Sequence, residues 1–286
     1  MDAQTFFRKL DRIQEIPTLP TVALKVNKML QDYDTSIKTL SKTIEKDQAM
    51  VSKILRLVNS AFYGFQSRIN NIPHAVTILG FNTVRNAVIS VSIIDTFSEK
   101  GAFEGFNVTD FWKHSVAVAV TSRYLAEKTR LAIPDESFVA GLLHDVGKVV
   151  LAQHFKEFFG QVWESMHKDD LSFYEAEKKL LPANHAQIGA HLAKRWHLPA
   201  GLIDAMRYHH AVRKTAYNLN LLISVHVADI IVNNYKIDPE SESDFSVTHP
   251  EAVKLMAAEL ETVSDWFPNV STEIESACDF FLEEGE

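Results

Sequence analysis

Apolar residues recur at helical spacing along almost the whole chain, and this pattern limits the possible fold more than any other feature of the sequence. Val22, Val26 and Met29 form one apolar stripe, and two others lie within residues 37–44 and 50–58. Spacings of three and four residues place side chains on one face of a helix, whereas a half-buried strand alternates apolar and polar residues. Such alternation is scarce here. The sequence therefore predicts an all-α protein.

Capping and breaking residues mark several of the expected helix ends. Ser172 and Glu175 match a capping box at a helix N-terminus. Asn184 and Gln187 imitate the same pattern, and Pro199 suits a first helical position. The expected helix stops are Gly64, Gly80 and Pro182.

Two polar segments divide the chain. Residues 98–110 contain two glycines and separate a first helical block from a histidine-rich one, and residues 238–250 precede two short amphipathic segments and an acidic end. We therefore expect an N-terminal helical part over residues 1–100, a helical core over 101–237, and a polar linker with a C-terminal helical extension over 238–286.

The composition excludes several classes of protein. With 286 residues, 46% of them hydrophobic, the chain is long enough for a well-covered core. A formal charge of −8 does not favour nucleic acid as a partner. The single cysteine, Cys278, rules out an intramolecular disulfide or a thiolate metal cluster and fits a reducing compartment. No stretch approaches 18 uncharged apolar residues, so we expect a cytoplasmic protein that does not enter a membrane.

Charged residues interrupt two apolar segments. Residues 142–151 read LLHDVGKVVL, which places His144 and Asp145 inside a run of Leu and Val. In LLISVHVADIIV, Asp229 shares a helix face with apolar residues spaced by three and four positions. Burying a carboxylate costs several kcal/mol unless its charge is compensated. Each aspartate therefore needs a partner.

A divalent cation would satisfy both aspartates. The chain has 12 histidines, and several fall on the helical segments that surround the two carboxylates. Imidazole and carboxylate suit Mn, Fe, Co, Ni or Zn, and a helical bundle can aim side chains from several helices at one point. The candidate ligands are His114, His144, Asp145, His185, His209, His210 and Asp229.

This ordered series resembles the HD superfamily of metal-dependent phosphohydrolases. The N-terminal block narrows the resemblance to the HDOD (HD-related output domain) family; the matching segments are IPTLPTVALKVNKML, SIKTLSKTIEKDQAMVSKILRLVNSAFYG and INNIPHAVTILGFNTVRNAVIS. The resemblance extends in one continuous order over about residues 13–235. It implies an HD-type helical bundle with an N-terminal helical subdomain.

The resemblance also implies roles for individual residues. In the superfamily the metal activates water for attack on phosphorus. By position, one ion would be held by His114, His144, Asp145 and Asp229, and a second, as in the binuclear HD-GYP phosphodiesterases, by His185, His209 and His210. Lys148 matches a phosphate-contacting lysine of active relatives, so Asp145 and Lys148 are the candidate catalytic residues.

The chain departs from both patterns that it resembles. HDOD domains commonly lose several ligand positions and act as regulatory modules in bacterial signalling, whereas this sequence keeps the full series. After the histidine pair it reads AVRKTAYNLNLL and lacks the Gly-Tyr-Pro triplet of HD-GYP enzymes. The metal site can therefore be intact although a cyclic-dinucleotide pocket is absent.

Several of these residues also have simpler interpretations. His144 and Asp145 could form a helix-terminal turn with Gly147 as its C-cap. Lys148 could be a surface lysine that extends past an apolar helix. Asp110, one turn before His114, could be an additional ligand but is expected to be the N-cap of its helix. The remaining histidines, expected at the surface or behind the ligands, are His74, His154, His167, His191, His197, His226 and His249.

We therefore expect a bacterial, HDOD-type signalling module with a His/Asp metal site that holds one or two ions, with Fe or Mn favoured and Ni, Co or Zn as alternatives. Its output would be a contact with a signalling protein. The alternative is an active metal-dependent phosphohydrolase acting on a nucleotide or another phosphate ester. A third interpretation is a metal that only braces the fold. The sequence leaves the oligomeric state open.

Overall fold

The structure is a computed structural model that describes residues 1–13, 19–29, 35–60, 68–97, 103–237 and 245–282. Within these ranges the chain forms helices joined by turns and contains no strand, which confirms the all-α prediction. In chain order the helices are α1 (Ala3–Arg12), α2 (Thr21–Met29), α3 (Ile37–Ile44), α4 (Gln48–Val58), α5 (Ile72–Phe97), α6 (Val108–Thr129), α7 (Pro134–Leu143), α8 (Val146–His154), α9 (Lys156–Asp169), α10 (Phe173–Leu180), α11 (His185–Arg195), α12 (Ala200–Tyr208), α13 (Leu219–Ile237), α14 (Pro250–Glu261) and α15 (Val263–Leu282).

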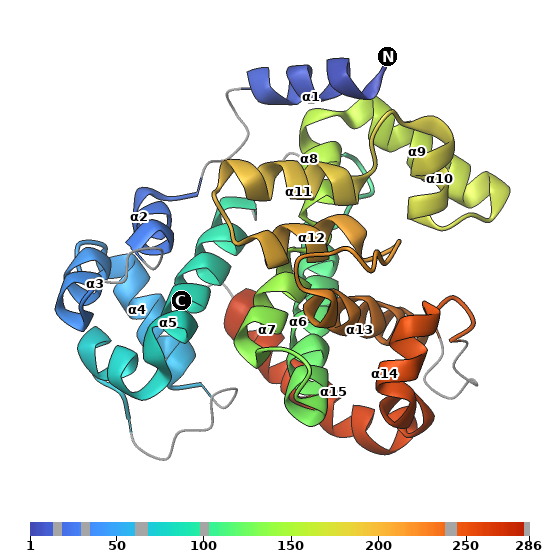
Figure 1. Ribbon diagram of the computed structural model, residues 1–286. Coiled ribbons are helices and arrows are strands. Elements are labelled where there is room, and N and C mark those ends of the chain that lie inside the picture. Colours follow the sequence, from blue (N-terminus) through green and yellow to red (C-terminus); the bar gives the residue numbers. More distant parts are fainter. Residues whose placement is uncertain (14–18, 30–34, 61–67, 98–102, 238–244, 283–286) are drawn as a thin grey trace.

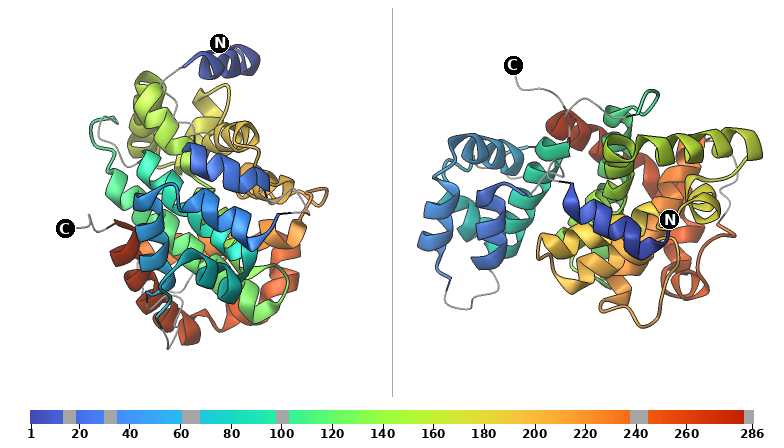
Figure 2. Two further views of the ribbon diagram at one scale, coloured as in Figure 1. Left: turned by 90° about the vertical axis from the view of Figure 1, so that its left-hand side faces the viewer. Right: turned by 90° about the horizontal axis from the view of Figure 1, so that it is seen from above.

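Helices α2 to α5 form an N-terminal lobe beside the rest of the molecule (Figures 1 and 2). Helices α2, α3 and α4 all pack against α5, and α5 packs in turn against α7. Asn27 of α2 is buried and donates hydrogen bonds to the carbonyl oxygens of Trp196 and His197, at 3.3 and 2.9 Å. The lobe is therefore joined to the core by both apolar packing and buried polar contacts.

Helices α6, α7 and α13 form the centre of the core. Their close packing follows from small side chains, since α6 carries the run VAVAVTS and α7 carries Gly141. A Cβ atom at Gly141 would lie 2.8 Å from the Cα atom of Ala119, so the two helices approach as closely as a glycine allows. Helix α12 packs between α11 and α13, and α11 contacts α8. This arrangement brings the ends of α7, α11 and α12 together.

The remaining helices cover the outside of this core. Helix α15 lies against α6, α14 contacts α13, and the hairpin of α9 and α10 extends from α8 (Figure 1). Helix α1 packs through Phe6, whose ring centroid lies 4.6 Å from that of Phe155. The division at residues 100 and 237 stays a prediction, and the joining residues 98–102 and 238–244 lie outside the described residues.

The predicted helix starts are confirmed at two of three positions. Ser172 and Asn184 are the N-caps of α10 and α11, and each forms a complete capping box. Pro199 is the N-cap of α12, and Ala200 is its first helical residue, so the predicted first helical position for Pro199 is wrong by one residue. Either position suits a proline, because neither needs a backbone N–H for the helix.

Two of the three predicted helix stops lie within the described residues. Helix α10 ends at Leu180, just before Pro182, as expected. Gly80 breaks the helical geometry inside α5 with a φ of +82°, but the chain then resumes its helix to Phe97. Gly80 therefore separates two helical segments, as expected, and a side chain would disfavour its backbone conformation. Gly64 lies outside the described residues.

Among the described helices, only α5 is long and apolar enough to cross a membrane by length and composition. Its most apolar window is 67% buried inside the protein, and Gly80 interrupts the helix. We therefore interpret α5 as the central helix of the N-terminal lobe.

Candidate metal centre

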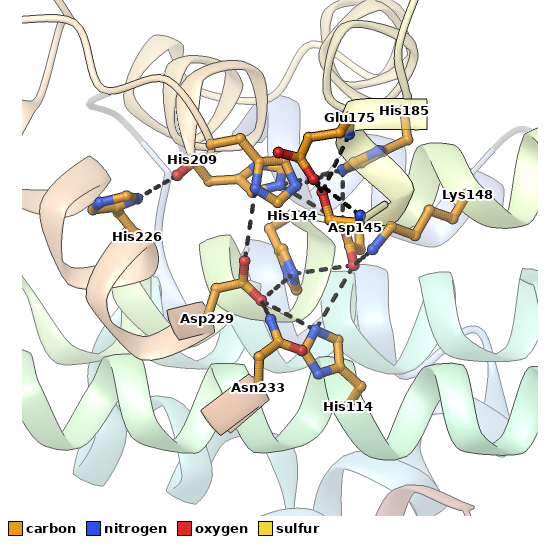
Figure 3. A network of polar contacts seen from close by, with 12 residues as sticks. His114, His144, Asp145, Lys148, Glu175, His185, His209, His226, Asp229 and Asn233 are labelled. Carbon is orange, nitrogen blue, oxygen red and sulfur yellow. Dashed lines mark hydrogen bonds and ion pairs between the residues drawn. The ribbon is translucent and has the colours of Figure 1, made fainter. Parts of the chain in front are cut away.

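The seven predicted ligand residues gather in the core in two adjoining groups. Figure 3 labels all of them except His210. They come from helices α6, α11 and α13, from the turn between α7 and α8, and from the end of α12. Most of them are buried: His144, His185 and His209 have no exposed surface. Their positions are set by helix ends and helix packing and do not depend on a flexible loop.

His114, His144 and Asp229 form a first group of donor atoms, which all lie within 4.8 Å of one another. The Nε2 atom of His114 is 3.2 Å from Oδ1 of Asp229, and Nε2 of His144 is 3.6 Å from the same oxygen. These three side chains come from three separate segments, namely α6, the turn after α7, and α13. Two imidazoles and one carboxylate are a donor set that suits a divalent transition metal.

Asp145, His185, His209 and His210 form a second group within the same 4.8 Å limit. Oδ1 of Asp145 is 3.0 Å from Nε2 of His185 and 3.6 Å from Nε2 of His209. The Nε2 atoms of His185 and His210 are 3.0 Å apart. Three imidazoles and a carboxylate therefore face one small volume.

Asp145 also reaches toward the first group. Its other oxygen, Oδ2, is 3.3 Å from Nε2 of His144 and 3.7 Å from Nε2 of His114. One carboxylate thus has an oxygen directed to each group. This is the geometry of a carboxylate that can bridge two neighbouring metal ions.

Hydrogen bonds behind the rings fix how three histidines face the centre. Nδ1 of His144 lies 2.6 Å from the carbonyl oxygen of Gly141, and Nδ1 of His209 lies 2.8 Å from that of Met206. Because a carbonyl only accepts, both Nδ1 atoms donate, so Nε2 is the nitrogen that each ring presents to the centre. Nδ1 of His185 contacts the carboxylate of Glu177 in the same way.

Gly147 lets the two halves of the centre approach each other. A Cβ atom at this position would lie 2.0 Å from the carbonyl oxygen of His185, so α8 and α11 can cross here only without a side chain. Gly147 is the second residue of α8, and His144 follows the last residue of α7. The interpretation of Gly147 as the C-cap of a simple turn is therefore wrong, because it lies inside the next helix.

The charges of the centre compensate one another. Burial opposes protonation of His144, but the carboxylates of Asp145 and Asp229 outweigh it and raise the pKa of His144 to about 10. Burial would raise the pKa of Asp145, but the charges of His144 and Lys148 hold it well below its usual value. Burial lowers the pKa of His209 to about 4. Without a metal, the carboxylates are thus balanced by the His144 imidazolium and the Lys148 ammonium group, and the carboxylates of Glu177 and Asp145 also raise the pKa of His185 against the effect of its burial.

Two buried atoms test whether the residues fit a metal. His144 Nε2 and Asp145 Oδ1 are fully enclosed and form no hydrogen bond of good geometry within the described part of the chain, although Oδ1 of Asp145 lies 3.0 Å from Nε2 of His185 and Nε2 of His144 lies 3.3 Å from Oδ2 of Asp145. Buried polar atoms without a well-formed hydrogen bond are costly, and both atoms point to the centre. A metal ion between them would satisfy both. The donor set of nitrogen and oxygen atoms therefore fits a divalent transition metal.

Lys148 points into the centre and not along the surface. Its ammonium nitrogen lies 2.5 Å from Oδ2 of Asp145 and 5.4 Å from the centroid of the Phe173 ring. The Lys148 side chain is 21% exposed, and the His210 side chain is 23% exposed. Lys148 and His210 are thus the parts of the centre that are most accessible to solvent.

Other sequence predictions near the centre have different outcomes. Asp110 is not the N-cap of α6; Asn107 takes that position and accepts hydrogen bonds from the backbone of Thr109 and Asp110. Asp110 is exposed, in the first turn of the helix, and belongs to neither ligand group. His226 was expected either at the surface or behind the ligands. It lies behind the candidate ligand His209, because its Nδ1 donates to the carbonyl oxygen of that residue.

Sequence reasoning missed two residues that support the ligands. Glu177 of α10 is fully buried against His185, and Asn233 donates to Oδ1 of Asp229 at 2.9 Å. Asn233 follows Asp229 by one helical turn, so its spacing could have suggested the contact. Glu177 lies in the polar segment AEKK, which has no local feature that predicts burial.

Comparisons with known proteins agree with this architecture. An uncharacterized protein of Treponema pallidum (strain Nichols) is 30% identical over 220 residues, which are 75% of this chain and 41% of that protein. The chain spans about two fifths of the length of the curated relatives that it matches.

Two solved structures are similar in fold. An HDOD domain protein of unknown function from Geobacter sulfurreducens has a TM-score of 0.79 and 26% identity, with 97% of each chain covered. A proposed phosphohydrolase from Shewanella amazonensis SB2B has a TM-score of 0.75 and 23% identity, covering 95% of this chain and 97% of the other. The family model for the HDOD domain matches residues 16–212, which is more than half of the sequence. The chain therefore belongs to the HDOD domain family.

Proposed function

We propose that this chain is a regulatory module of HDOD type whose conformation depends on a binuclear divalent-metal centre. The observation that carries the proposal is the position of Asp145, which directs one oxygen to each of two histidine groups. In this assignment His114, His144 and Asp229 would hold the first ion, and His185, His209 and His210 would hold the second. Asp145 would offer one carboxylate oxygen to each site. Fe or Mn is the favoured metal.

A bound divalent ion would supply Lewis acidity and lower the pKa of nearby water. The chain's own residues determine whether a substrate can use that chemistry. Most ligands are buried, and only His210 and Lys148 expose about a fifth of their side chains. Such narrow access supports a module in which metal occupancy sets the shape of the core, and in which a signalling protein in the cytoplasm reads that shape.

An active phosphohydrolase is the second candidate, and Lys148 is the observation that favours it. Its ammonium group lies beside Asp145 and is partly open to solvent, where it could bind a phosphoryl oxygen. The fold shared with a proposed phosphohydrolase of Shewanella amazonensis is compatible with that activity. In this case Lys148 would orient a phosphate ester toward the metals.

Metal content tests the first proposal, measured by elemental analysis on protein purified without chelator or affinity metal. We expect two equivalents of metal per chain in the wild type and a loss of both in Asp145→Ala. Asp110→Ala is the matched control, because it removes an exposed carboxylate one helical turn from His114 and should keep both ions. No metal in the wild type would contradict the proposal.

A screen of phosphodiesters and phosphomonoesters separates the two candidates. Turnover by the wild type that is lost in Lys148→Ala, with both metals retained, would establish the enzyme. Two bound metals without turnover of any substrate would favour the regulatory module.

A further inference from the structure

Helix α10 covers the second ligand group with three of its side chains. The Phe173 ring lies below the ammonium group of Lys148, and the Tyr174 ring stacks on His210 with centroids 4.4 Å apart. Glu177, one turn further along, contacts His185. Helix α10 otherwise packs mainly against α9. Its inner face is therefore devoted to the metal centre.

Glu177 binds His185 through both carboxylate oxygens. One oxygen accepts a hydrogen bond from the backbone N–H of His185 at 2.8 Å, and the other contacts Nδ1 of the same residue. His185 is the first residue of α11, so its N–H has no partner within the helix. Both residues are fully buried. The contact therefore fixes the backbone and the ring of His185 together.

The other supported histidines do not depend on a side chain in this way. His144 and His209 donate to the backbone carbonyls of Gly141 and Met206, which every residue type provides. His114 has no hydrogen bond at Nδ1. Within the described residues, His185 is thus the candidate ligand whose Nδ1 is held by an acidic side chain outside the two ligand groups; Nδ1 of His210 lies 3.9 Å from Asp229, which is itself a candidate ligand.

We propose that Glu177 is a positioning residue that determines whether the second metal ion binds. By accepting hydrogen bonds from the backbone N–H and from Nδ1 of His185, it holds the ring so that Nε2, the nitrogen that a metal would bind, faces the second group and lies 3.0 Å from Oδ1 of Asp145. This inference rests on the proposed binuclear centre. The first group, which contacts neither Glu177 nor His185, should bind its ion independently.

Glu177→Gln is the sharpest variant, because it keeps the size of the side chain and changes its hydrogen bonding. An amide has one accepting oxygen and one donating nitrogen, whereas Glu177 accepts two hydrogen bonds. If the amide nitrogen faces Nδ1, the proton of His185 moves to Nε2, where the metal should bind. If it faces the backbone, two buried donors oppose each other, which is costly.

The experiment measures Mn²⁺ binding by equilibrium dialysis and by electron paramagnetic resonance. We expect two ions in the wild type with the signal of a coupled pair, and one ion with an isolated Mn²⁺ signal in Glu177→Gln. Its affinity for the second ion should fall about 10- to 100-fold. Glu175→Gln is the control: it makes the same change on α10, but Glu175 is exposed and bound to Ser172, and Gln can also complete a capping box.

The outcomes distinguish this inference from the proposed function. A wild type with fewer than two ions would overturn both. A wild type with two ions and a Glu177→Gln variant with two ions of unchanged affinity would overturn only the positioning role. Loss of both ions in a folded Glu177→Gln variant would also overturn it, because Glu177 would then support the whole centre and not one subsite.

A second measurement needs no variant. In the Zn²⁺-loaded wild type, nitrogen-edited NMR of the histidine rings should show His185 with its proton on Nδ1, shifted strongly downfield by the hydrogen bond to Glu177. A His185 ring whose Nδ1 carries no proton would overturn the positioning role, even if Glu177→Gln failed to fold.

Discussion

At Gly147 the backbone of α8 lies against the carbonyl of His185 and leaves no space for a side chain. We therefore predict the effect of adding one. Gly147→Ala would place a Cβ atom 2.0 Å from that oxygen, so the first turn of α11 must move and take His185 with it. We expect a loss of stability of about 1–3 kcal/mol, typical of overpacking, together with weaker binding of the second ion. Chemical denaturation and Mn²⁺ titration measure the two effects.

Gly189→Ala is the matched control at the same contact between helices. Its Cβ atom would meet Cε of Met206 at 3.3 Å, the flexible end of a side chain that can shift. It should therefore retain both ions and most of its stability. Equal losses in the two variants would mean that the crossing of α8 and α11 tolerates a side chain at Gly147.

The protonation of His144 makes metal binding depend on pH. In the metal-free chain its pKa is about 10, so at pH 7 the ring carries a proton that a metal must displace. Each displaced proton increases metal affinity about tenfold per pH unit as the pH rises toward 10. His209, with a pKa of about 4, is already neutral at pH 7 and adds no proton.

Calorimetric titration with Mn²⁺ in two buffers of different ionisation enthalpy counts the protons released. At pH 7 we expect at least one proton per chain to be released, with affinity rising between pH 6 and pH 8. Binding that releases no proton over this range would contradict the assignment of His144 as a ligand that is protonated in the metal-free state.

At the scale of single helices, the N-cap of α10 should influence the metal centre. Ser172 accepts a hydrogen bond from the backbone of Glu175, and the helix that it starts carries Glu177 toward His185. Ser172→Ala should lower the free energy of unfolding by about 1 kcal/mol. It should also weaken binding of the second ion, because α10 would fray where it covers the centre. Thermal melting and Mn²⁺ dialysis measure these effects.

Ser36→Ala provides the control for this prediction. Ser36 caps α3 by the same kind of hydrogen bond to Thr39, but α3 belongs to the N-terminal lobe. It should lower stability by a similar amount and leave metal binding unchanged. Weaker metal binding in both variants would show that the centre responds to general stability and not to α10.

The segments that carry the candidate ligands could be identified from the sequence because their polar residues contradict their surroundings. A histidine and an aspartate inside LLHDVGKVVL have few explanations in a helical protein other than a shared partner. Glu177 gave no such signal, because its segment AEKK is typical of an exposed helix face. It is buried because it contacts His185 at the start of α11. That contact between helices leaves no periodic pattern in the sequence.

Helix ends show the same limit. Capping residues act within four positions, so Ser172 and Asn184 could be identified from the sequence alone. Gly80 was correctly associated with a break in helical geometry, but the direction that the chain takes after the break is decided by packing. The segment after Gly80 is mostly buried, and α5 packs against α2, α3 and α4 as well as against α7.

At the scale of the whole molecule, the centre links segments that are distant in the sequence. Its candidate ligands extend from His114 to Asp229, and none of them lies among the described residues of the N-terminal lobe. A metal that binds only the folded chain stabilises it by about 2.7 kcal/mol when its free concentration is one hundred times its dissociation constant. Metal occupancy should therefore stabilise the core more than the lobe.

Metal removal tests this difference. Adding a chelator should lower the Tm of the wild type by about 5–10 °C, because about 2.7 kcal/mol is lost and each kcal/mol corresponds to about 2–4 °C in a chain of this size. After metal removal, the rate of amide hydrogen exchange should rise most in α11 and α13, which carry candidate ligands, and least in α3 and α4. Asp145→Ala should melt at the same temperature with and without chelator. If the chelator lowered the Tm of that variant as much as that of the wild type, the stabilising metal would have to bind elsewhere in the chain.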